Sequence, residues 1–204
     1  MNYLAHAWLS FNDEGILMGN MLSDFVKGRQ RYTYSEEVQK GITLHRAIDE
    51  FTDAHVLTAS AKQVFRPSLG LYAGAFTDIA YDHFLAKDAS ENSEEGWRSF
   101  TDGTYSALKR YAEAHPVPER FARMLHYMKA ENWLFNYRHR WCIENSFRGM
   151  TYRAKFLEES NTIAAYAAFE NNYEHLQQCY QEFFPLLKAF AWEQYLYLCK
   201  KTEF

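Results

Sequence analysis

The sequence predicts an all-α protein, and three observations lead to that prediction. Apolar residues recur at helical spacing through most of the 204 residues. No segment alternates polar and apolar residues between two turn signals, which is the pattern of a half-buried strand. Hydrophobic residues make up 48% of the chain and aromatic residues 18%, which supplies a packed core. We expect one helical bundle over residues 1–204, with site-bearing helices at about 2–88 and supporting helices at about 93–201.

Two short helices are expected at the N-terminus. The first spans residues 2–11 and ends at an Asn-Asp-Glu-Gly turn. The second spans residues 16–26 and contains Gly19 and Asn20, two poor helix formers. Because glycine lets another backbone come close, this pair indicates tight packing against a neighbouring helix.

The third helix is expected to begin after Ser35. Serine is a favoured N-cap residue, and the two glutamates that follow it suit the positive end of the helix dipole. We expect this helix to run to about residue 58. A break is predicted at residues 66–68, because Pro67 interrupts helical hydrogen bonding, and the next helix is expected at residues 69–87.

The second half of the chain continues the helical pattern. The expected helices span residues 93–115, 120–137, 140–150 and 162–201. The last of these is interpreted either as one helix or as two that join near Pro185. The apolar residues expected to be mainly structural are Phe100, Leu108, Trp133, Phe184 and Trp192.

One polar stripe distinguishes the third helix. His45, Asp49 and Asp53 follow one another at intervals of four residues, and each such step turns an α-helix by only about 40°. The three side chains therefore share one face. An imidazole and a carboxylate at positions i and i+4 are able to bind one divalent cation together. A helix face that meets only water is the alternative interpretation.

Further polar residues in apolar surroundings favour the metal interpretation. Asp78, Asp82 and His83 lie in the helix expected at residues 69–87, and His6 and Asp24 lie in the first two helices. Charged side chains are seldom buried unless they are paired or bind metal. Helical bundles build metal sites from inward carboxylates and imidazoles. Such ligands suit Mn²⁺ or Mg²⁺, with iron or zinc left open.

Charge and cysteine content exclude several classes of protein. A formal net charge of −4 is not that of a nucleic-acid-binding protein. The three cysteines are odd in number and lack metal-type spacing, so they are interpreted as reduced core thiols. No signal peptide and no apolar run of membrane-spanning length are found. We expect a cytoplasmic protein that binds neither nucleic acid nor membrane, and its oligomeric state stays open.

Several motifs of this chain resemble those of one enzyme family. The motifs are NYLAH at residues 2–6, GNMLSDFVKG at 19–28, GITLHRAIDEFTD at 41–53, YDHFL at 81–85 and, more weakly, WLFNYR at 133–138 followed by GM at 149–150. Their order and spacing resemble the acyl carrier protein phosphodiesterase family over nearly the whole chain. The resemblance implies an all-α relative of the HD-domain phosphohydrolases. It also implies a Mn²⁺-dependent enzyme that removes 4′-phosphopantetheine from the serine of holo-acyl carrier protein.

The resemblance and the polar stripes together suggest roles for individual residues. The expected metal ligands are Asp24, His45, Asp49, Asp78 and Asp82. The expected catalytic groups are His6 or His83, as the donor of a proton to the leaving serine oxygen, and Asp53, which would orient a histidine.

Contacts with the substrate are expected from polar residues near these groups. Asn20, Lys27 and Arg46 are expected to bind the substrate, the two cations through its phosphate group. Arg29 and Arg31 are expected to contact the acidic carrier protein. Two rival interpretations remain. One is an HD-like nucleotide phosphohydrolase, and the other is a non-enzymatic helical adaptor that binds a partner through its aromatic C-terminal third.

Overall fold

The computed structural model describes residues 1–200, and within that range every regular element is a helix. The α-helices are α1 (Tyr3–Trp8), α2 (Glu14–Leu22), α3 (Glu36–Ala54), α4 (Val56–Leu69), α5 (Ala73–Lys87), α6 (Glu94–Ala114), α7 (Glu119–Ala130), α8 (Trp133–Asn136), α9 (Arg140–Arg153), α10 (Glu159–Asn171) and α11 (Tyr173–Lys200). The short 3-10 helices are η1 (Ser23–Phe25), η2 (Gly28–Thr33) and η3 (Gly70–Tyr72). The prediction of an all-α protein is confirmed. None of the described helices is long and apolar enough to cross a membrane.

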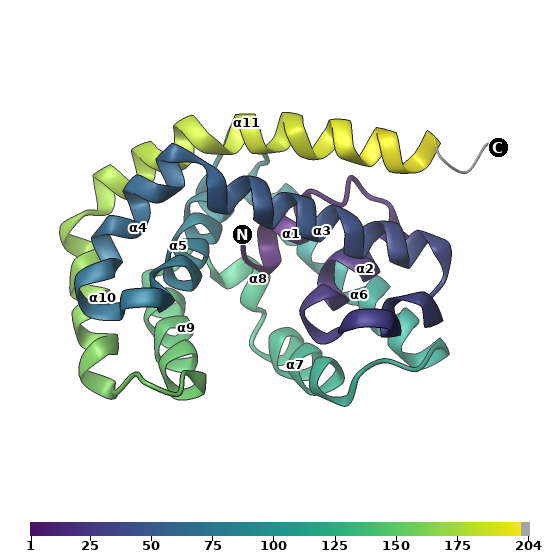
Figure 1. Cartoon of the computed structure of the whole chain (residues 1–204), viewed down its shortest axis with the longest axis horizontal. Coiled ribbons are helices and arrows are strands. Elements are labelled where there is room, and N and C mark those ends of the chain that lie inside the picture. The colour runs from purple at the N-terminus through teal and green to yellow at the C-terminus, as the bar shows by residue number, and fades with distance from the viewer. Residues whose placement is uncertain (201–204) are drawn as a thin grey trace.

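The long helix α11 spans the molecule and ties its two halves together (Figure 1). Helices α4, α5, α9 and α10 lie under one half of α11, and α2, α3, α6 and α7 lie under the other. The short helix α1 lies between these groups and packs against both α2 and α5. The fold therefore brings the first residues of the chain to the middle of the molecule, beside α3.

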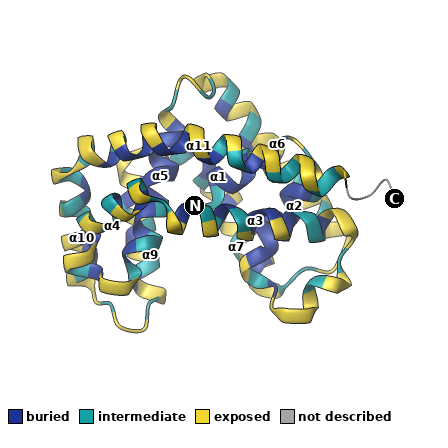
Figure 2. Cartoon of the chain, turned by 45° about the horizontal axis from the view of Figure 1, so that its top comes forward, coloured by how far each residue is buried: buried dark blue, intermediate teal, exposed yellow. Residues whose placement is uncertain are grey.

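Buried residues lie on the inward faces of the helices and exposed residues on the outward faces (Figure 2), and most of the buried residues are apolar. Leu108 and Phe184 are each 1% exposed, as expected for structural residues. Phe100 is partly buried and packs edge-on against Trp8. Trp192, also expected to be structural, is 45% exposed and therefore lies outside the buried core. It lies at the surface against Phe11 from the turn after α1, with ring centroids 4.9 Å apart.

Helices α2 and α3 pack with their backbones in direct contact. A Cβ atom on Gly19 would lie 2.0 Å from the backbone oxygen of Val38, and one on Gly41 would lie 2.3 Å from that of Ile16. Since no side chain fits at either position, the close approach predicted from Gly19 is confirmed. This contact holds the end of α2 against the middle of α3.

The boundary between α3 and α4 lies earlier than predicted. Helix α3 ends at Ala54 rather than near residue 58, because His55 adopts an extended backbone with φ of −79° and ψ of 137°. The imidazole Nδ1 of His55 then accepts a hydrogen bond from the Leu57 amide and begins α4. A histidine in the N-cap position is less common than serine or aspartate, and the sequence therefore gives little sign of this break.

The predicted interruptions at proline differ from the observed ones. The break expected at Pro67 is wrong, since this residue lies in the last turn of α4, where a missing N–H removes a single hydrogen bond. The helix ends just after it, at Gly70 with φ of 52°. Pro185 lies inside the continuous helix α11. Interruptions fall instead at Asn172, between α10 and α11, and at Asn132, which adopts the left-handed conformation between α7 and α8.

Candidate metal centre

Helix α3 places an imidazole and a carboxylate side by side. The His45 Nε2 lies 3.1 Å from the Asp49 Oδ2, one turn further along the helix, as their spacing predicts. The His45 Nδ1 donates a hydrogen bond of 2.8 Å to the backbone oxygen of Asn20. This bond directs Nε2 toward the carboxylate. The His45 Nε2 is buried and has no hydrogen-bond partner among the described residues.

Helix α1 adds a second imidazole to this pair. The rings of His6 and His45 stack with centroids 3.9 Å apart, and the His6 Nε2 lies 3.2 Å from the Asp49 Oδ1. The side-chain Nδ2 of Asn20 donates to the His6 backbone oxygen at 2.9 Å and to the Ser10 hydroxyl at 3.1 Å. The Oδ1 of the same amide therefore faces the His6 Nδ1, at 3.0 Å. Asn20 thus orients both histidines, which turn their Nε2 atoms toward one carboxylate.

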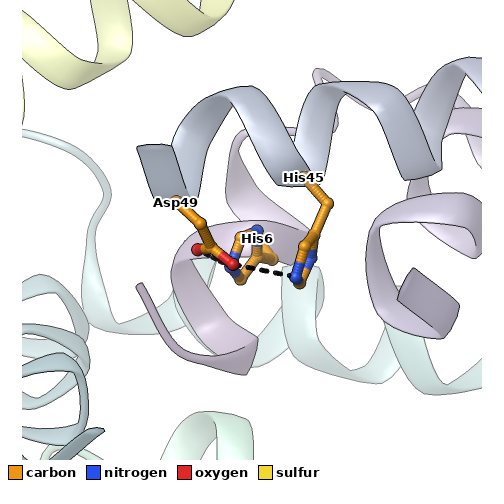
Figure 3. A group of neighbouring side chains, drawn as sticks. All are labelled: His6, His45 and Asp49. Carbon is orange, nitrogen blue, oxygen red and sulfur yellow. Dashed lines mark ion pairs between the residues drawn. The ribbon is translucent and has the colours of Figure 1, made fainter. Parts of the chain in front are cut away.

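His6, His45 and Asp49 form a candidate metal site (Figure 3). One ligand-type atom from each residue lies within 4.8 Å of the other two. In the part of the chain that the structure describes, this is the one group of three or more such residues with that geometry. Two buried imidazole nitrogens that converge on one carboxylate fit a bound cation. Two imidazoles and one carboxylate are ligands that divalent transition metals accept.

The charges around this site favour an additional cation. Burial lowers the pKa of His45, but the carboxylates of Asp24 and Asp49 outweigh burial and raise that pKa to about 9. Burial and the neighbouring His45 lower the pKa of His6 to about 4. Burial opposes the ionisation of Asp49, yet the two histidines hold its pKa well below the ordinary value. A divalent cation at this place would displace the proton of His45.

Asp24 supplies a second carboxylate on the solvent side of the site. It lies in η1, directly after α2, and its Oδ1 is 3.3 Å from the His45 Nε2. Its side chain is 64% exposed. The contact with His45 holds the pKa of Asp24 below its ordinary value, so the carboxylate is charged at neutral pH. Asp24 thus lies outside the group of three ligand-type residues, on its more exposed side.

A cleft of about 240 Å³ opens beside this group. Asp24 and Asp78 contribute to its lining next to the candidate site, and much of the remaining lining comes from one face of α9. The sequence prediction assigned none of the α9 residues to the site. Trp141, Gly149 and Arg153 of α9 are separated by eight and four residues and therefore lie on one helix face. This spacing is the feature of the sequence that could have indicated their place in the cleft.

Comparison with known proteins identifies the family. The family model described as acyl carrier protein phosphodiesterase matches residues 1–187. This chain belongs to the acyl carrier protein phosphodiesterase family. A curated relative of that name from Photorhabdus laumondii is 30% identical over 100% of this chain and 96% of its own length. Relatives of the same name from Klebsiella pneumoniae and Salmonella agona are each 30% identical, over 94% of this chain and 97% of their own length. No solved structure matches the chain.

Asp78 lies next to the candidate site in this family member without joining its three ligand-type atoms. Its Oδ1 is 3.3 Å from the amine nitrogen of Met1, and that nitrogen is also 3.3 Å from the Asp49 Oδ1. Burial raises the pKa of Asp78 above its ordinary value. The residue lines the cleft, so its carboxyl group lies between the candidate site and the space available to a substrate.

Asp82 anchors α1 instead of pointing into the ligand group. It is fully buried, and its two oxygens accept hydrogen bonds from the backbone amides of Leu4, at 2.7 Å, and Ala5, at 3.2 Å. These amides belong to the first turn of α1, where no helical partner exists for them. Asp82 therefore fixes the helix that carries His6. Burial raises its pKa to about 7, although the two amides favour the charged form.

Two further predicted site residues lie in other contacts. The His83 Nδ1 donates to the Tyr137 backbone oxygen at 2.7 Å, and its Nε2 accepts from the Tyr173 hydroxyl at 2.8 Å. Both nitrogens of His83 are thus occupied by contacts between helices. Asp53 pairs with Lys62 at 2.7 Å on the surface. The structure therefore does not bring either residue to the histidines of the candidate site.

The predicted substrate and partner contacts divide into two groups. Asn20 is 1% exposed, so it acts on the site through the histidines that it orients. Lys27, Arg29 and Arg46 are exposed, and Arg31 stacks on the ring of its neighbour in η2. Lys27 and the two arginines of η2 directly follow the turn that carries Asp24.

Proposed function

We propose that this chain is a divalent-metal-dependent phosphodiesterase that releases 4′-phosphopantetheine from the serine of holo-acyl carrier protein and leaves apo-acyl carrier protein. Family membership supports the substrate. The single observation that carries the chemistry is the group of His6, His45 and Asp49, in which two buried Nε2 atoms converge on one carboxylate. Mn²⁺ is the proposed ion, and Mg²⁺ and iron are the alternatives that such ligands accept.

The residues of the site have separate roles in the proposed phosphodiester hydrolysis. His6, His45 and Asp49 would hold a divalent cation, which would neutralise phosphoryl oxygens and lower the pKa of bound water. Asn20 keeps both imidazoles oriented through their Nδ1 atoms. Asp24, charged and exposed at the edge of the cleft, accepts the proton of the attacking water at its carboxylate.

The leaving serine oxygen needs a proton, and Asp78 is the proposed donor. Its carboxyl lines the cleft, and burial raises its pKa, which favours the protonated form. The two histidines predicted for this role have other contacts. The His6 Nε2 contacts Asp49, and both ring nitrogens of His83 form hydrogen bonds with tyrosine residues.

We also propose where and in what form the protein acts. The chain would form one unit, which the packing of α1 against both α2 and α5 supports, and the motif resemblance suggests that this unit is HD-domain-like. Its carrier-protein substrate places it in the cytoplasm. The exposed Lys27 and Arg29 and the partly buried Arg31 follow Asp24 in the chain, and this supports their contact with an acidic partner.

The test of this proposal is mass spectrometry of holo-acyl carrier protein after incubation with the purified protein and Mn²⁺. The expected result is loss of the 4′-phosphopantetheine mass from the carrier and its appearance as a free product. Chelation of the metal should stop the reaction, and added Mn²⁺ should restore it.

Two parallel measurements separate the rival functions. Turnover of a nucleotide panel with an unchanged holo-carrier would favour a nucleotide phosphohydrolase. A metal-free preparation that captures a partner without any turnover would favour an adaptor. Full activity without metal would contradict the proposed mechanism.

A further inference from the structure

The cleft beside the candidate site extends along one face of α9. Trp141, Asn145, Gly149 and Arg153 all line it, and they are spaced by one helical turn. Twelve residues of an α-helix rise about 18 Å. The lining therefore follows an elongated path, which suits a ligand that is long and narrow.

The lining side chains of this path are of two kinds. Trp133, Trp141 and Met150 offer apolar surface, while Asn145 and Ser146 offer hydrogen-bond donors and acceptors. Trp133 is fixed by a hydrogen bond of 2.8 Å from its Nε1 to Glu131. Such a mixture of flat apolar surface and a few polar groups is typical of sites for small organic ligands.

Among residues 1–200, the cleft contains one cationic group that is free to bind an anion. Asp24, Asp78 and Glu131 line the cleft with carboxylates. The amine of Met1 also lines it but is paired with Asp49. Arg153 makes no hydrogen bond and no ion pair with any of the residues 1–200. An unpaired guanidinium suits a phosphate group, because its N–H donors match two phosphoryl oxygens.

We propose that this cleft binds the prosthetic arm of the substrate, with Arg153 contacting its phosphate and the α9 face holding its chain of amide groups. The proposal rests on the proposed function for the identity of the arm. 4′-Phosphopantetheine carries two amides between its phosphate and its terminal thiol. The amides are suited to hydrogen bonds with Asn145 and Ser146, and the methylene segments are suited to apolar packing against Trp133 and Trp141.

Gly149 provides the sharpest test of the α9 face. A Cβ atom at this position meets nothing closer than the Arg153 Nη1, at 3.9 Å, so alanine fits without a clash. A leucine side chain would extend further into the cleft and compete with the arm. Gly149→Leu is therefore the blocking variant, and Gly149→Ala is its matched control.

The measurement compares the affinities of the Mn²⁺-loaded protein for 4′-phosphopantetheine and for inorganic phosphate by calorimetric titration. The wild type and Gly149→Ala should bind 4′-phosphopantetheine at least about tenfold more tightly than phosphate, and Gly149→Leu should lose most of this preference. Trp141→Ala is the second variant, because Trp141 is 52% exposed and the fold does not depend on it. It should reduce the preference several-fold.

Arg153 is tested by its effect on both ligands. Arg153→Gln should weaken the binding of phosphate and of 4′-phosphopantetheine by a similar factor, of about tenfold. The ratio of the two affinities should therefore stay unchanged. Arg148→Gln is the control, since Arg148 is an exposed arginine of the same helix that pairs with Glu144 at 3.3 Å. It should leave both affinities unchanged.

The outcomes separate this inference from the proposed function. Equal affinity of the wild type for the two ligands, or a preference that survives both Gly149→Leu and Trp141→Ala, would overturn the inference. Cleavage of holo-carrier protein would then still support the function. A clear preference that Gly149→Leu removes, without any cleavage of holo-carrier protein, would support the arm-binding cleft and contradict the proposed reaction.

Discussion

At the scale of single residues, Asn20 organises the candidate site. Its backbone oxygen accepts from the His45 Nδ1, and its side chain faces the His6 Nδ1. One residue therefore sets the direction of two stacked imidazoles. Because the side chain is buried and also holds Ser10, its place is fixed by the fold rather than by a ligand. The site is thus organised before a cation arrives, which lowers the cost of binding one.

Asp49→Ala should abolish both metal binding and turnover while leaving the helical content nearly unchanged. Asp49 contacts both histidines through its two oxygens, so its removal takes away the anionic ligand. Metal analysis of the purified variant and turnover of holo-carrier protein provide the check. Asp53→Ala is the matched control, because Asp53 lies one turn further on α3 and pairs with Lys62. Normal metal content in Asp49→Ala would exclude Asp49 as a ligand.

His83 should make the protein less stable at acidic pH. Burial lowers the pKa of His83 from its ordinary value of 6.5 to about 4. As the pH falls below 6.5 the unfolded chain binds a proton at this histidine before the folded chain does, so stability is lost between pH 6.5 and 4. His83→Gln should cost about 1–3 kcal/mol at pH 7, because it disturbs two buried hydrogen bonds.

The difference in melting temperature between the wild type and His83→Gln is the quantity to measure. It should shrink as the pH falls from 7 toward 4, because only the wild type then loses the contribution of a neutral imidazole at this position. His6 is present in both proteins and cancels in the comparison. A difference that is constant with pH would show that His83 titrates normally.

At the scale of elements, the site depends on how α1, α2 and α3 are fixed to one another. Asp82 of α5 holds the amides at the start of α1, which carries His6. Gly19 and Gly41 let α2 and α3 touch, which brings Asn20 to His45. These contacts position the ligand-type residues without taking part in the chemistry.

Gly19→Ala should destabilise the protein by about 1–3 kcal/mol or more, because its Cβ would overlap the Val38 backbone oxygen. Gly103→Ala is the matched control, since Gly103 lies inside α6 and a Cβ there meets nothing within 4 Å. That substitution should be neutral or stabilise by about 0.5–1 kcal/mol. Chemical denaturation of both variants gives the comparison. Equal stability of the two would contradict the close packing of α2 on α3.

At the scale of the whole molecule, the sequence predicted what is local and missed what depends on packing. The spacing of His45 and Asp49 within one helix was enough to place them on one face. Asp82 and His83 are also polar residues in an apolar helix, but Asp82 is hydrogen-bonded to α1 and His83 to Tyr137 and Tyr173. Such partners lie far away in the sequence, so periodicity contains no information about them. The role of α9 in lining the cleft was missed for the same reason.

Charge reversal near the site should affect encounter with the carrier protein. Arg29→Glu combined with Arg31→Glu should raise KM for holo-carrier protein and change kcat much less, because such surface charges act mainly on association. Added salt should weaken binding by the wild type and reduce its difference from the variant. Steady-state kinetics at low and high ionic strength give the result. An unchanged KM at low salt would exclude this surface as the docking site.

The most direct measurement of the central claim is an anomalous diffraction map from crystals of the protein grown with Mn²⁺. We expect one strong manganese peak bounded by the Nε2 atoms of His6 and His45 and the carboxylate of Asp49. The ligand distances should be about 2.0–2.3 Å, the range found for divalent ions in such sites. A peak at Asp78 and Asp82 without these histidines, or no peak in crystals of a protein that is active with Mn²⁺, would contradict it.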